Sequence, residues 1–210
     1  MKKLFLIALL SALPAFANPA FAQIDDQSKP QALIQTATQQ VLNEVRSRAV
    51  APDDIPRITA IVNRDILPYT DLRRTTQLAM GRYWRTATPE QQDQIIEQFK
   101  ILLIHTYAGA IAQLRPDQQI AYPPSRFEPT ETDVVVRTVA LDTASGQPVQ
   151  IDYRLHKTPQ GWRVYDLNVM GAWLVQTYRQ QFNEIIQQGG VEGLLRSLTE
   201  RNRLPVVVKQ

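Results

Sequence analysis

The first half of the chain repeats its apolar residues with the period of an α-helix. Three such segments run over residues 32–49, 53–66 and 70–84, and each places apolar side chains at intervals of three and four. Asp53 or Asp54 stands where the second segment needs an N-cap. The pattern therefore predicts three amphipathic helices whose apolar faces pack on a common interior.

A fourth helix has the clearest start signal in the sequence. Thr88 can cap it, Pro89 occupies its first position, and Gln91 completes a capping box. The helix is expected to end near Leu114, before Pro116. Its apolar side chains form one broad stripe, which comprises Ile95, Phe99, Leu102, Leu103, Tyr107, Ala110 and Ile111.

After this helix the apolar period changes from 3.6 to 2, which indicates β-strands. Pro123 and Pro124 confine the first strand to an edge of the sheet, because proline cannot donate to a strand ladder. The four expected strands cover residues 120–127, 132–143, 149–156 and 162–169. One face of the third strand carries Val149, Ile151, Tyr153 and Leu155.

A last helix follows the strands and is interrupted once. It is expected to begin at Gly171 and to break at Gly189 and Gly190, and residues 204–210 form a strand-like tail. The order of helices, then strands, then helices predicts an α+β fold with an antiparallel sheet. No repeat, low-complexity tract or linker divides residues 23–210, so we expect one domain there.

Large apolar side chains face one another across the predicted sheet and helices. Periodicity does not distinguish a filled core from the wall of a cavity, and a filled core is the simpler interpretation. The aromatic residues on predicted inner faces are Tyr83, Trp84, Phe99, Tyr107, Tyr153, Trp162, Trp173, Tyr178 and Phe182.

The first 22 residues have the three parts of a signal peptide. Lys2 and Lys3 form a positive start, residues 4–13 are apolar, and residues 20–22 fit an Ala-x-Ala cleavage site. An apolar stretch of about ten residues is too short to span a membrane, which takes roughly 20. We therefore expect cleavage before Gln23 and export of the mature chain to the periplasm.

Charge and cysteine content exclude several classes of protein. Subtracting Lys2 and Lys3 from 23 basic residues leaves 21, against 20 acidic residues, so the mature chain is close to neutral. Nucleic-acid binding and strong attraction to anionic lipid surfaces both need a clustered excess of basic residues. The near-neutral charge of the mature chain therefore argues against both. The sequence has no cysteine, so neither disulfides nor thiol chemistry are expected.

Candidates for metal, cofactor or catalytic chemistry are sparse. His105 and His156 have no third ligand at metal spacing, and no nucleotide- or cofactor-binding motif is present, so we expect neither a metal nor a cofactor. By simple alternation Asp166 shares a strand face with Val164 and points inward.

Two interpretations of Asp166 stand side by side. An inward carboxylate near Tyr153 or Tyr165 could transfer protons, as in ketosteroid isomerases. Alternatively, the carboxylate pairs with an arginine such as Arg163 or Arg179, or accepts hydrogen bonds from the start of a helix. The structural interpretation is favoured, because a lone carboxylate is a weak signal of catalysis.

Three blocks of residues, in order along the chain, resemble the MlaC / toluene-tolerance family, and together they span essentially the whole mature chain. The first block comprises Met80, Gly81, Arg82, Tyr83, Trp84, Arg85, Thr88, Pro89, Glu90 and Gln91, followed by Phe99, Leu102, Leu103, Thr106 and Tyr107. The second and third blocks comprise Val149, Ile151, Tyr153 and Leu155, then Trp162, Arg163, Val164, Tyr165, Asp166 and Leu167, and finally Tyr178, Arg179 and Phe182.

The resemblance implies a periplasmic phospholipid carrier without catalytic activity. Such a protein moves lipid between an outer-membrane lipoprotein–porin complex and an inner-membrane ABC transporter with its substrate-binding domain, and so maintains outer-membrane lipid asymmetry. The implied fold is a curved antiparallel sheet of about four strands packed against several helices around an apolar cleft. The implied carrier is a monomer, and the residues expected to line its cleft are Phe99, Leu103, Tyr107, Val134, Val136, Ile151, Tyr153, Leu155, Val164, Trp173 and Leu174.

Local departures from the family pattern leave details of the site open. Trp173 replaces the usual serine, and Thr177 stands where asparagine is common, so Trp173 is expected either to shorten the cleft or to cap its mouth. Alternatives to a phospholipid carrier are a ketosteroid-isomerase-like enzyme, a carrier of another apolar lipid such as a hopanoid, and an interaction module with a solid core. Candidate docking residues are Arg73, Arg74, Arg82 and Arg85.

Overall fold

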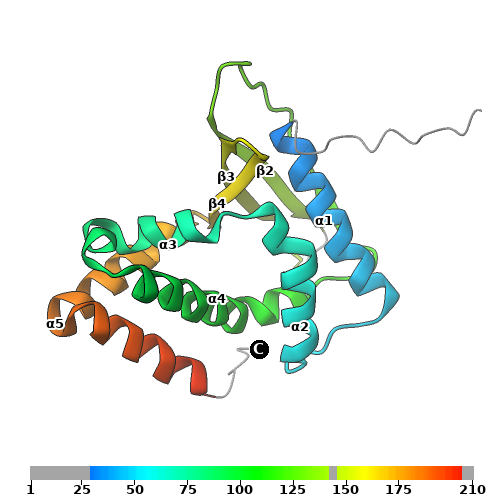
Figure 1. The fold of residues 1–210 in the computed structure, drawn as a ribbon. Coiled ribbons are helices and arrows are strands. Elements are labelled where there is room, and N and C mark those ends of the chain that lie inside the picture. The colour runs from blue at the N-terminus through cyan, green and yellow to red at the C-terminus, as the bar shows by residue number, and fades with distance from the viewer. Residues whose placement is uncertain (1–28, 142–145, 205–210) are drawn as a thin grey trace, which may run out of the picture.

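The computed structural model describes residues 29–141 and 146–204. The expected signal peptide (residues 1–22) lies outside the described residues, as does the expected strand-like tail beyond Leu204. A curved antiparallel sheet lies against a group of helices (Figure 1), as predicted for an α+β fold.

The helices occupy the segments that the apolar pattern predicted, with short irregular turns between them. Asp54 caps α2 by accepting a hydrogen bond from the backbone N–H of Arg57 at 3.2 Å. The helices are α1 (Pro30–Ser47), α2 (Ile55–Ile61), α3 (Leu72–Met80), α4 (Pro89–Ala112) and α5 (Leu174–Arg203). The short segments are a π-helix, η1 (Val62–Ile66), and two 3-10 helices, η2 (Leu67–Tyr69) and η3 (Gly81–Thr86).

The capping box at the start of α4 is confirmed. The backbone N–H of Gln91 donates to Thr88 Oγ1 at 3.2 Å, and the backbone N–H of Thr88 donates to Gln91 Oε1 at 2.9 Å. Two backbone donors that the helix cannot pair internally are thereby satisfied. The cap fixes where α4 begins and so sets which of its side chains face the other helices.

In the described part of the chain, the sheet has five strands in sequence order, each antiparallel to its neighbours. Tyr153 lies at its centre, opposite Val136 on one side and Leu167 on the other. The strands are β1 (Gln119–Ala121), β2 (Asp133–Leu141), β3 (Val149–Thr158), β4 (Gly161–Val169) and β5 (Ala172–Trp173).

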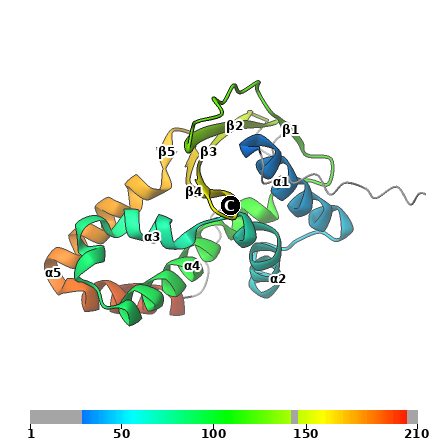
Figure 2. The same ribbon diagram turned by 45° about the horizontal axis from the view of Figure 1, so that its top comes forward.

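Helix α1 packs into the concave face of this sheet. Figure 2 shows the strands arching over the helix. Leu33 and Ile34 of α1 are almost fully buried there against side chains of three strands. Those strand residues are Val134, Val136, Leu155 and Trp162.

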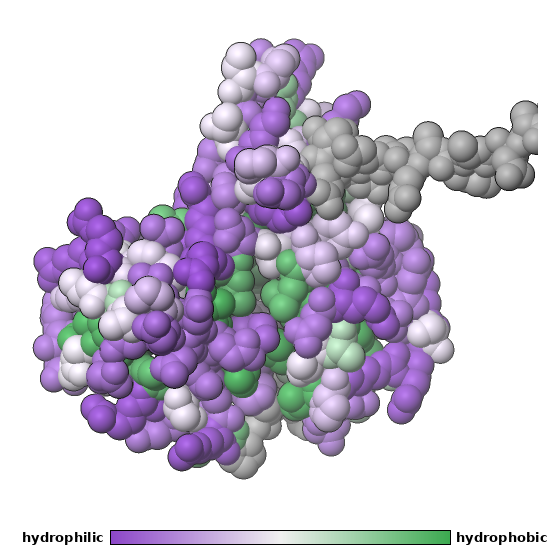
Figure 3. Space-filling view, in the orientation of Figure 1, coloured by the Kyte–Doolittle hydropathy of each residue, from purple (hydrophilic) through white to green (hydrophobic). Residues whose placement is uncertain are grey.

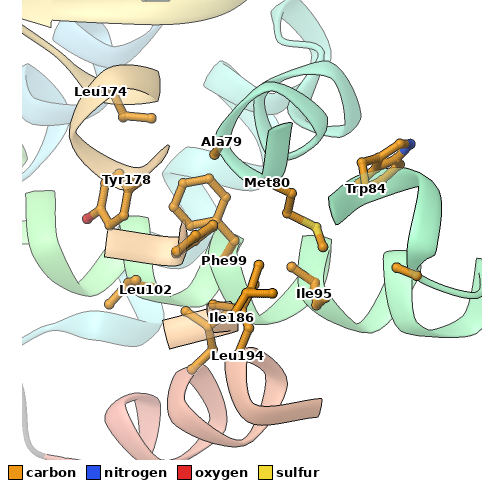
Figure 4. Packing of buried hydrophobic residues seen from close by; sticks show 13 residues of the cluster. Ala79, Met80, Trp84, Ile95, Phe99, Leu102, Leu174, Tyr178, Ile186 and Leu194 are labelled. Atoms are coloured by element: carbon orange, nitrogen blue, oxygen red, sulfur yellow. The ribbon is translucent and has the colours of Figure 1, made fainter. Parts of the chain in front are cut away.

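The other helices form a second, larger packing unit around Phe99 of α4. Figure 4 shows Phe99 enclosed by side chains of α3, α4 and α5. Its ring meets those of Tyr178 and Phe182 edge-on, with centroid distances of 4.8 and 5.0 Å. Such perpendicular contacts suit the charge distribution of aromatic rings. The second half of α5 joins this unit because non-helical backbone at Gly190 (φ 67°) breaks the helix where the sequence predicted.

Three elements differ from the sequence-based prediction. The first strand ends at Ala121 rather than near Phe127, because Pro123 and Pro124 cannot continue the ladder. Residues 172–173 form the short strand β5 before α5 begins at Leu174, so the sheet has five strands rather than four. The third helix is divided at Gly81, beyond which the chain continues as the 3-10 helix η3.

Candidate functional site

The concave face of the sheet brings together the strand residues that were predicted to line a cleft. Val136 lies opposite Tyr153, and Val134 lies opposite Leu155. Since paired residues in a sheet point to the same side, these side chains share one face. The predicted residues on this face are Val134, Val136, Ile151, Tyr153, Leu155 and Val164.

The predicted helical residues divide into two groups. Phe99 is fully buried and Leu174 nearly so, and both belong to the packed interior of the helical unit. Leu103 and Tyr107 are only partly buried and lie at the margin of that unit. Leu103 and Tyr107 therefore have surface left for a ligand, whereas Phe99 is enclosed by protein.

Trp173 lies apart from the other predicted site residues. Its ring stacks on the guanidinium group of Arg154, 3.8 Å from the ring centroid. Arg154 precedes Leu155 on β3 and points to the opposite, convex face of the sheet. The structure therefore does not place Trp173 across from Ile151 or Tyr153, contrary to the expectation that it shortens or caps the cleft.

Within residues 29–141 and 146–204, the buried hydrophobic side chains form three separate clusters instead of one. A solid core of a domain this size usually forms one contiguous cluster. The sheet cluster joins α1 to β2, β3 and β4, and the helical cluster surrounds Phe99. The third cluster, built around Ile58, joins α1, α2 and α4. Tyr153 packs on the sheet cluster while its strand partner Leu167 packs on the helical cluster, so these two side chains lie where the clusters adjoin.

Helix α4 carries more apolar surface than its packing uses. Its length and composition alone would allow it to span a membrane, yet only 28% of its most apolar 18-residue window is buried. Leu103, Tyr107 and Ile111 are among its partly buried apolar side chains. Figure 3 shows hydrophobic residues on both sides of a recess near the centre of the molecular surface in that view. This unburied apolar surface indicates a lined cleft at this point.

The tyrosines near the junction are desolvated although none is fully buried. Burial raises the pKa of Tyr153 to about 12, against the opposing effect of a hydrogen bond with Thr138. Burial also raises the pKa values of Tyr107 and Tyr122. The concave face around Tyr153 is thus a region from which the protein excludes much of the water.

Tyr153→Phe is expected to remove a pH-dependent part of the free energy of unfolding. The folded pKa of about 12 exceeds the ordinary value of 10.0, so the folded state retains this proton longer than the unfolded state does. The resulting stabilisation is complete below the ordinary pKa and is lost as the pH rises through the folded pKa. Between about pH 9 and about pH 11, the wild type should lose about 1 kcal/mol relative to the variant. Chemical denaturation at both pH values tests this, and parallel curves would contradict it.

Asp166 does not point inward, because β4 contains a β-bulge. Arg154 lies opposite Asp166, whereas the next residue, Leu155, lies opposite Val164, which leaves Tyr165 as the extra residue. A bulge inserts one residue and so offsets the alternation of side chains beyond it. Asp166 consequently shares the convex face with Arg154, and Leu167 takes the expected place of Asp166 on the concave face.

The convex position gives Asp166 a structural role. Its Oδ1 accepts hydrogen bonds from the backbone N–H groups of Leu167 and Val175, both at 2.9 Å, and its Oδ2 pairs with Arg154 at 3.2 Å. Burial raises the pKa of Asp166, while these hydrogen bonds and Arg154 act in the opposite direction. The expected bond from a helix start is confirmed, since Val175 lies in the first turn of α5. The paired arginine is Arg154 rather than Arg163 or Arg179.

Asp166→Ala is expected to lower the free energy of unfolding by about 2–4 kcal/mol, because it removes the acceptor of two N–H groups and the partner of a cation. Urea denaturation measures the effect. Asp117→Ala provides the control, since Asp117 forms an exposed pair with Arg115 and should change stability far less. Equal losses in the two variants would contradict a structural role for Asp166.

A second polar cluster on the convex face attaches α3 to the sheet. Asp71 caps α3 by accepting from the backbone N–H of Arg74, and its other carboxylate oxygen lies 3.0 Å from His156 Nε2. Tyr165 donates to Asp133 at 2.8 Å and lies under the guanidinium group of Arg74. These contacts hold α3, and with it the helical unit, against the sheet.

The described residues contain no cluster of three metal-ligating side chains. A surface groove of about 410 Å³ runs along the first half of α5, where Trp173, Gln176, Thr177 and Gln180 are among its mostly polar lining residues. It lies outside the predicted cleft. The sequence-based prediction missed three residues on the concave side of the sheet: Leu33 and Ile34, which lie far from the sheet in sequence and are buried against it, and Leu167, which the bulge turns inward.

A sequence model of one family, MlaC protein, matches residues 35–200 of this chain. The intermembrane phospholipid transport system binding protein MlaC of Haemophilus influenzae is 21% identical over 187 residues, which cover 88% of this chain and 87% of that protein. The toluene tolerance protein ttg2D of Pseudomonas putida is 26% identical over 187 residues, covering 88% of this chain and 82% of that protein.

A solved structure resembles this fold closely. It is a phospholipid-binding protein from Ralstonia solanacearum, determined in complex with a phospholipid. The two proteins are 46% identical and superpose with a TM-score of 0.78, over 83% of this chain and 97% of that one.

Proposed function

Because this chain belongs to the MlaC protein family, we propose that it is a phospholipid-binding transport protein whose cleft between sheet and helices holds the acyl chains. The observation that carries the proposal is the phospholipid bound to the Ralstonia solanacearum protein, which is 46% identical to this chain. The two proteins also share their fold, with a TM-score of 0.78.

The physical chemistry of the cargo supports the same assignment. Two acyl chains of roughly 15 methylenes each would cost on the order of 25 kcal/mol to expose to water, at about 0.8 kcal/mol per methylene. A carrier must therefore replace most of the bilayer with apolar side chains. The apolar excess on α4 and the concave face of the sheet would provide such surfaces on the two sides of the proposed cleft.

The lining proposed for the acyl chains combines the two walls. Ile151, Tyr153 and Val164 contribute from the sheet, and Leu103 and Tyr107 from α4. The proposal uses no charged group inside the cleft and assigns no catalytic step, since Asp166 lies on the convex face, away from Tyr153. The phospholipid headgroup would remain in solvent at the mouth of the cleft.

The proposal also includes a route for phospholipid transport. The chain would act in the periplasm after removal of residues 1–22, shuttling phospholipid between an outer-membrane lipoprotein–porin complex and an inner-membrane ABC transporter. The name of the Haemophilus influenzae relative, an intermembrane phospholipid transport system binding protein, supports this route. Such shuttling would maintain the lipid asymmetry of the outer membrane.

Lipid extraction tests the proposal directly. The protein is expressed with its own N-terminal segment, purified from the periplasm without detergent, and extracted with chloroform and methanol. Mass spectrometry is expected to find phospholipid in near-stoichiometric amount, and the delipidated protein should take up labelled phospholipid from vesicles. An extract without lipid, together with no uptake, would refute the proposal. A hopanoid or another isoprenoid lipid in the extract would replace phospholipid as the cargo.

A further inference from the structure

We propose that Arg82, Arg85 and Arg179 form a docking surface for an acidic segment of a partner protein. These three residues are called the arginine patch below. They come from two elements far apart in the sequence: Arg82 and Arg85 belong to η3, and Arg179 belongs to α5. The inference extends the proposed function, because a carrier has to meet donor and acceptor complexes, and it is tested separately from lipid binding.

The backbone brings the three arginine residues to one corner of the molecule. Arg82 and Arg85 are three residues apart in a 3-10 helix, where side chains at that spacing lie above one another. The guanidinium group of Arg179 lies 3.2 Å from the point that a Cβ on Gly81 would occupy. Figures 1 and 2 both show α3 beside the first half of α5, on the side of the helical unit away from α1.

Gly81 makes this corner possible. Its backbone angles (φ 57°, ψ −128°) lie in a region that is essentially restricted to glycine. A side chain at this position would be strained and would also press on Arg179. The turn at Gly81 therefore directs η3 across the start of α5 and sets Arg82 and Arg85 beside Arg179.

The charges of the arginine patch are not neutralised within the part of the chain that the structure describes. All three side chains are exposed, and none forms an ion pair with a described residue. Arg82 stacks on the ring of Tyr83 at 4.9 Å and donates to its hydroxyl group, which orients the guanidinium group and leaves other N–H groups free. The neighbouring Arg73, in contrast, is paired with Asp93.

The patch is a local feature of an almost neutral protein. The whole chain carries a formal net charge of +3, so three unpaired arginines at one corner stand out from its average composition. A planar guanidinium group forms two parallel hydrogen bonds with a carboxylate, and an oriented group loses less entropy when it does so. Carboxylates of an acidic protein segment match this arrangement.

A bilayer surface fits the patch less well. Proteins that bind membranes through basic residues usually insert apolar side chains beside them. The large exposed hydrophobic residues of the described chain are Val135, Met170 and Leu204, and none of them belongs to η3 or adjoins Arg179 in sequence. We therefore assign the patch to an acidic protein segment and treat membrane binding as a contradicting outcome.

Fluorescence anisotropy with a labelled peptide of alternating glutamate and serine tests the proposal. The wild type should bind the peptide, and rising salt should weaken binding. The triple variant R82E/R85E/R179E should lose affinity by about tenfold or more, and R82Q/R85Q/R179Q should lose less. The matched control R48E/R126E/R196E changes the net charge equally at dispersed exposed arginines and should stay within about twofold of the wild type.

Parallel measurements make each outcome decisive. Circular dichroism confirms the fold of every variant, and the lipid content of the same preparations shows whether the cleft still works, so lost docking is distinguished from lost lipid binding. Equal losses in patch and control variants, or no peptide binding by the wild type, would overturn the proposal. It would also be overturned if the wild type bound vesicles containing phosphatidylglycerol, but not the peptide, in a patch-dependent way.

Discussion

Val164→Trp is expected to abolish phospholipid retention while the protein remains folded. Val164 is partly buried on the concave face of the sheet, opposite Leu155, so a larger side chain there extends into the proposed acyl-chain space. An indole ring takes the volume of several methylene groups, and the displaced chain has no other dry place to lie. Mass spectrometry of detergent-free preparations should find the lipid content reduced by about tenfold or more, which requires the dissociation constant to rise by at least that factor.

Val135→Trp is the matched control for this prediction. It makes the same substitution on β2, which β3 separates from β4, but Val135 points to the convex face and is 38% exposed. The control should retain lipid like the wild type. Leu103→Trp fills the same space from α4 and should lose lipid as well. Full lipid content in both Val164→Trp and Leu103→Trp would show that the acyl chains lie elsewhere.

Phe99→Ala should cause the largest loss of stability among single substitutions in the helical unit, about 3–5 kcal/mol. Phe99 is fully buried, and its ring contacts those of Tyr178 and Phe182 edge-on. Removing it creates a cavity bounded by α3, α4 and both halves of α5, which cannot all move inward together. Urea denaturation of delipidated protein measures the loss, since bound lipid would otherwise stabilise the folded state.

Phe127→Ala is the comparison for Phe99→Ala. Phe127 is a partly exposed residue between β1 and β2 that packs on the margin of the sheet cluster, so its loss should cost about 1 kcal/mol. Similar losses of unfolding free energy in the two variants would mean that Phe99 does not lie at the centre of a tightly packed helical unit. A large loss of bound lipid in Phe99→Ala without loss of stability would instead place Phe99 in the cleft.

The features that could be predicted from the sequence are those that depend on neighbours along the chain. The capping box at Thr88 and the break at Gly190 are set by local backbone chemistry, and both are confirmed. The inward side of β2 and β3 follows from strict alternation, which places Val136 and Tyr153 on the same face. Local rules therefore suffice for most element positions and for much of one wall of the cleft.

The features that could not be predicted depend on contacts between distant segments. The alternating pattern of a strand does not reveal the bulge at Tyr165. Because of the bulge, Asp166 and Leu167 lie on the opposite sides of the sheet from those expected. The position of Trp173 depends on Arg154, which is distant in sequence and reaches it across the sheet. That Leu33 and Ile34 cover the concave face likewise requires knowing how α1 crosses the sheet. These long-range arrangements decide what the cleft contains.

The bulge in β4 also bears on how such a protein can change over evolutionary time. Val164 and Leu167 both face inward with two outward residues, Tyr165 and Asp166, between them. Deleting Tyr165 would restore regular alternation and leave Val164 and Leu167 on the inner side. It would remove the hydroxyl group that binds Asp133 and the carbonyl that accepts from Thr75 of α3. A one-residue deletion at this point can thus change how α3 is attached to the sheet without changing which side chains of β4 face the concave side.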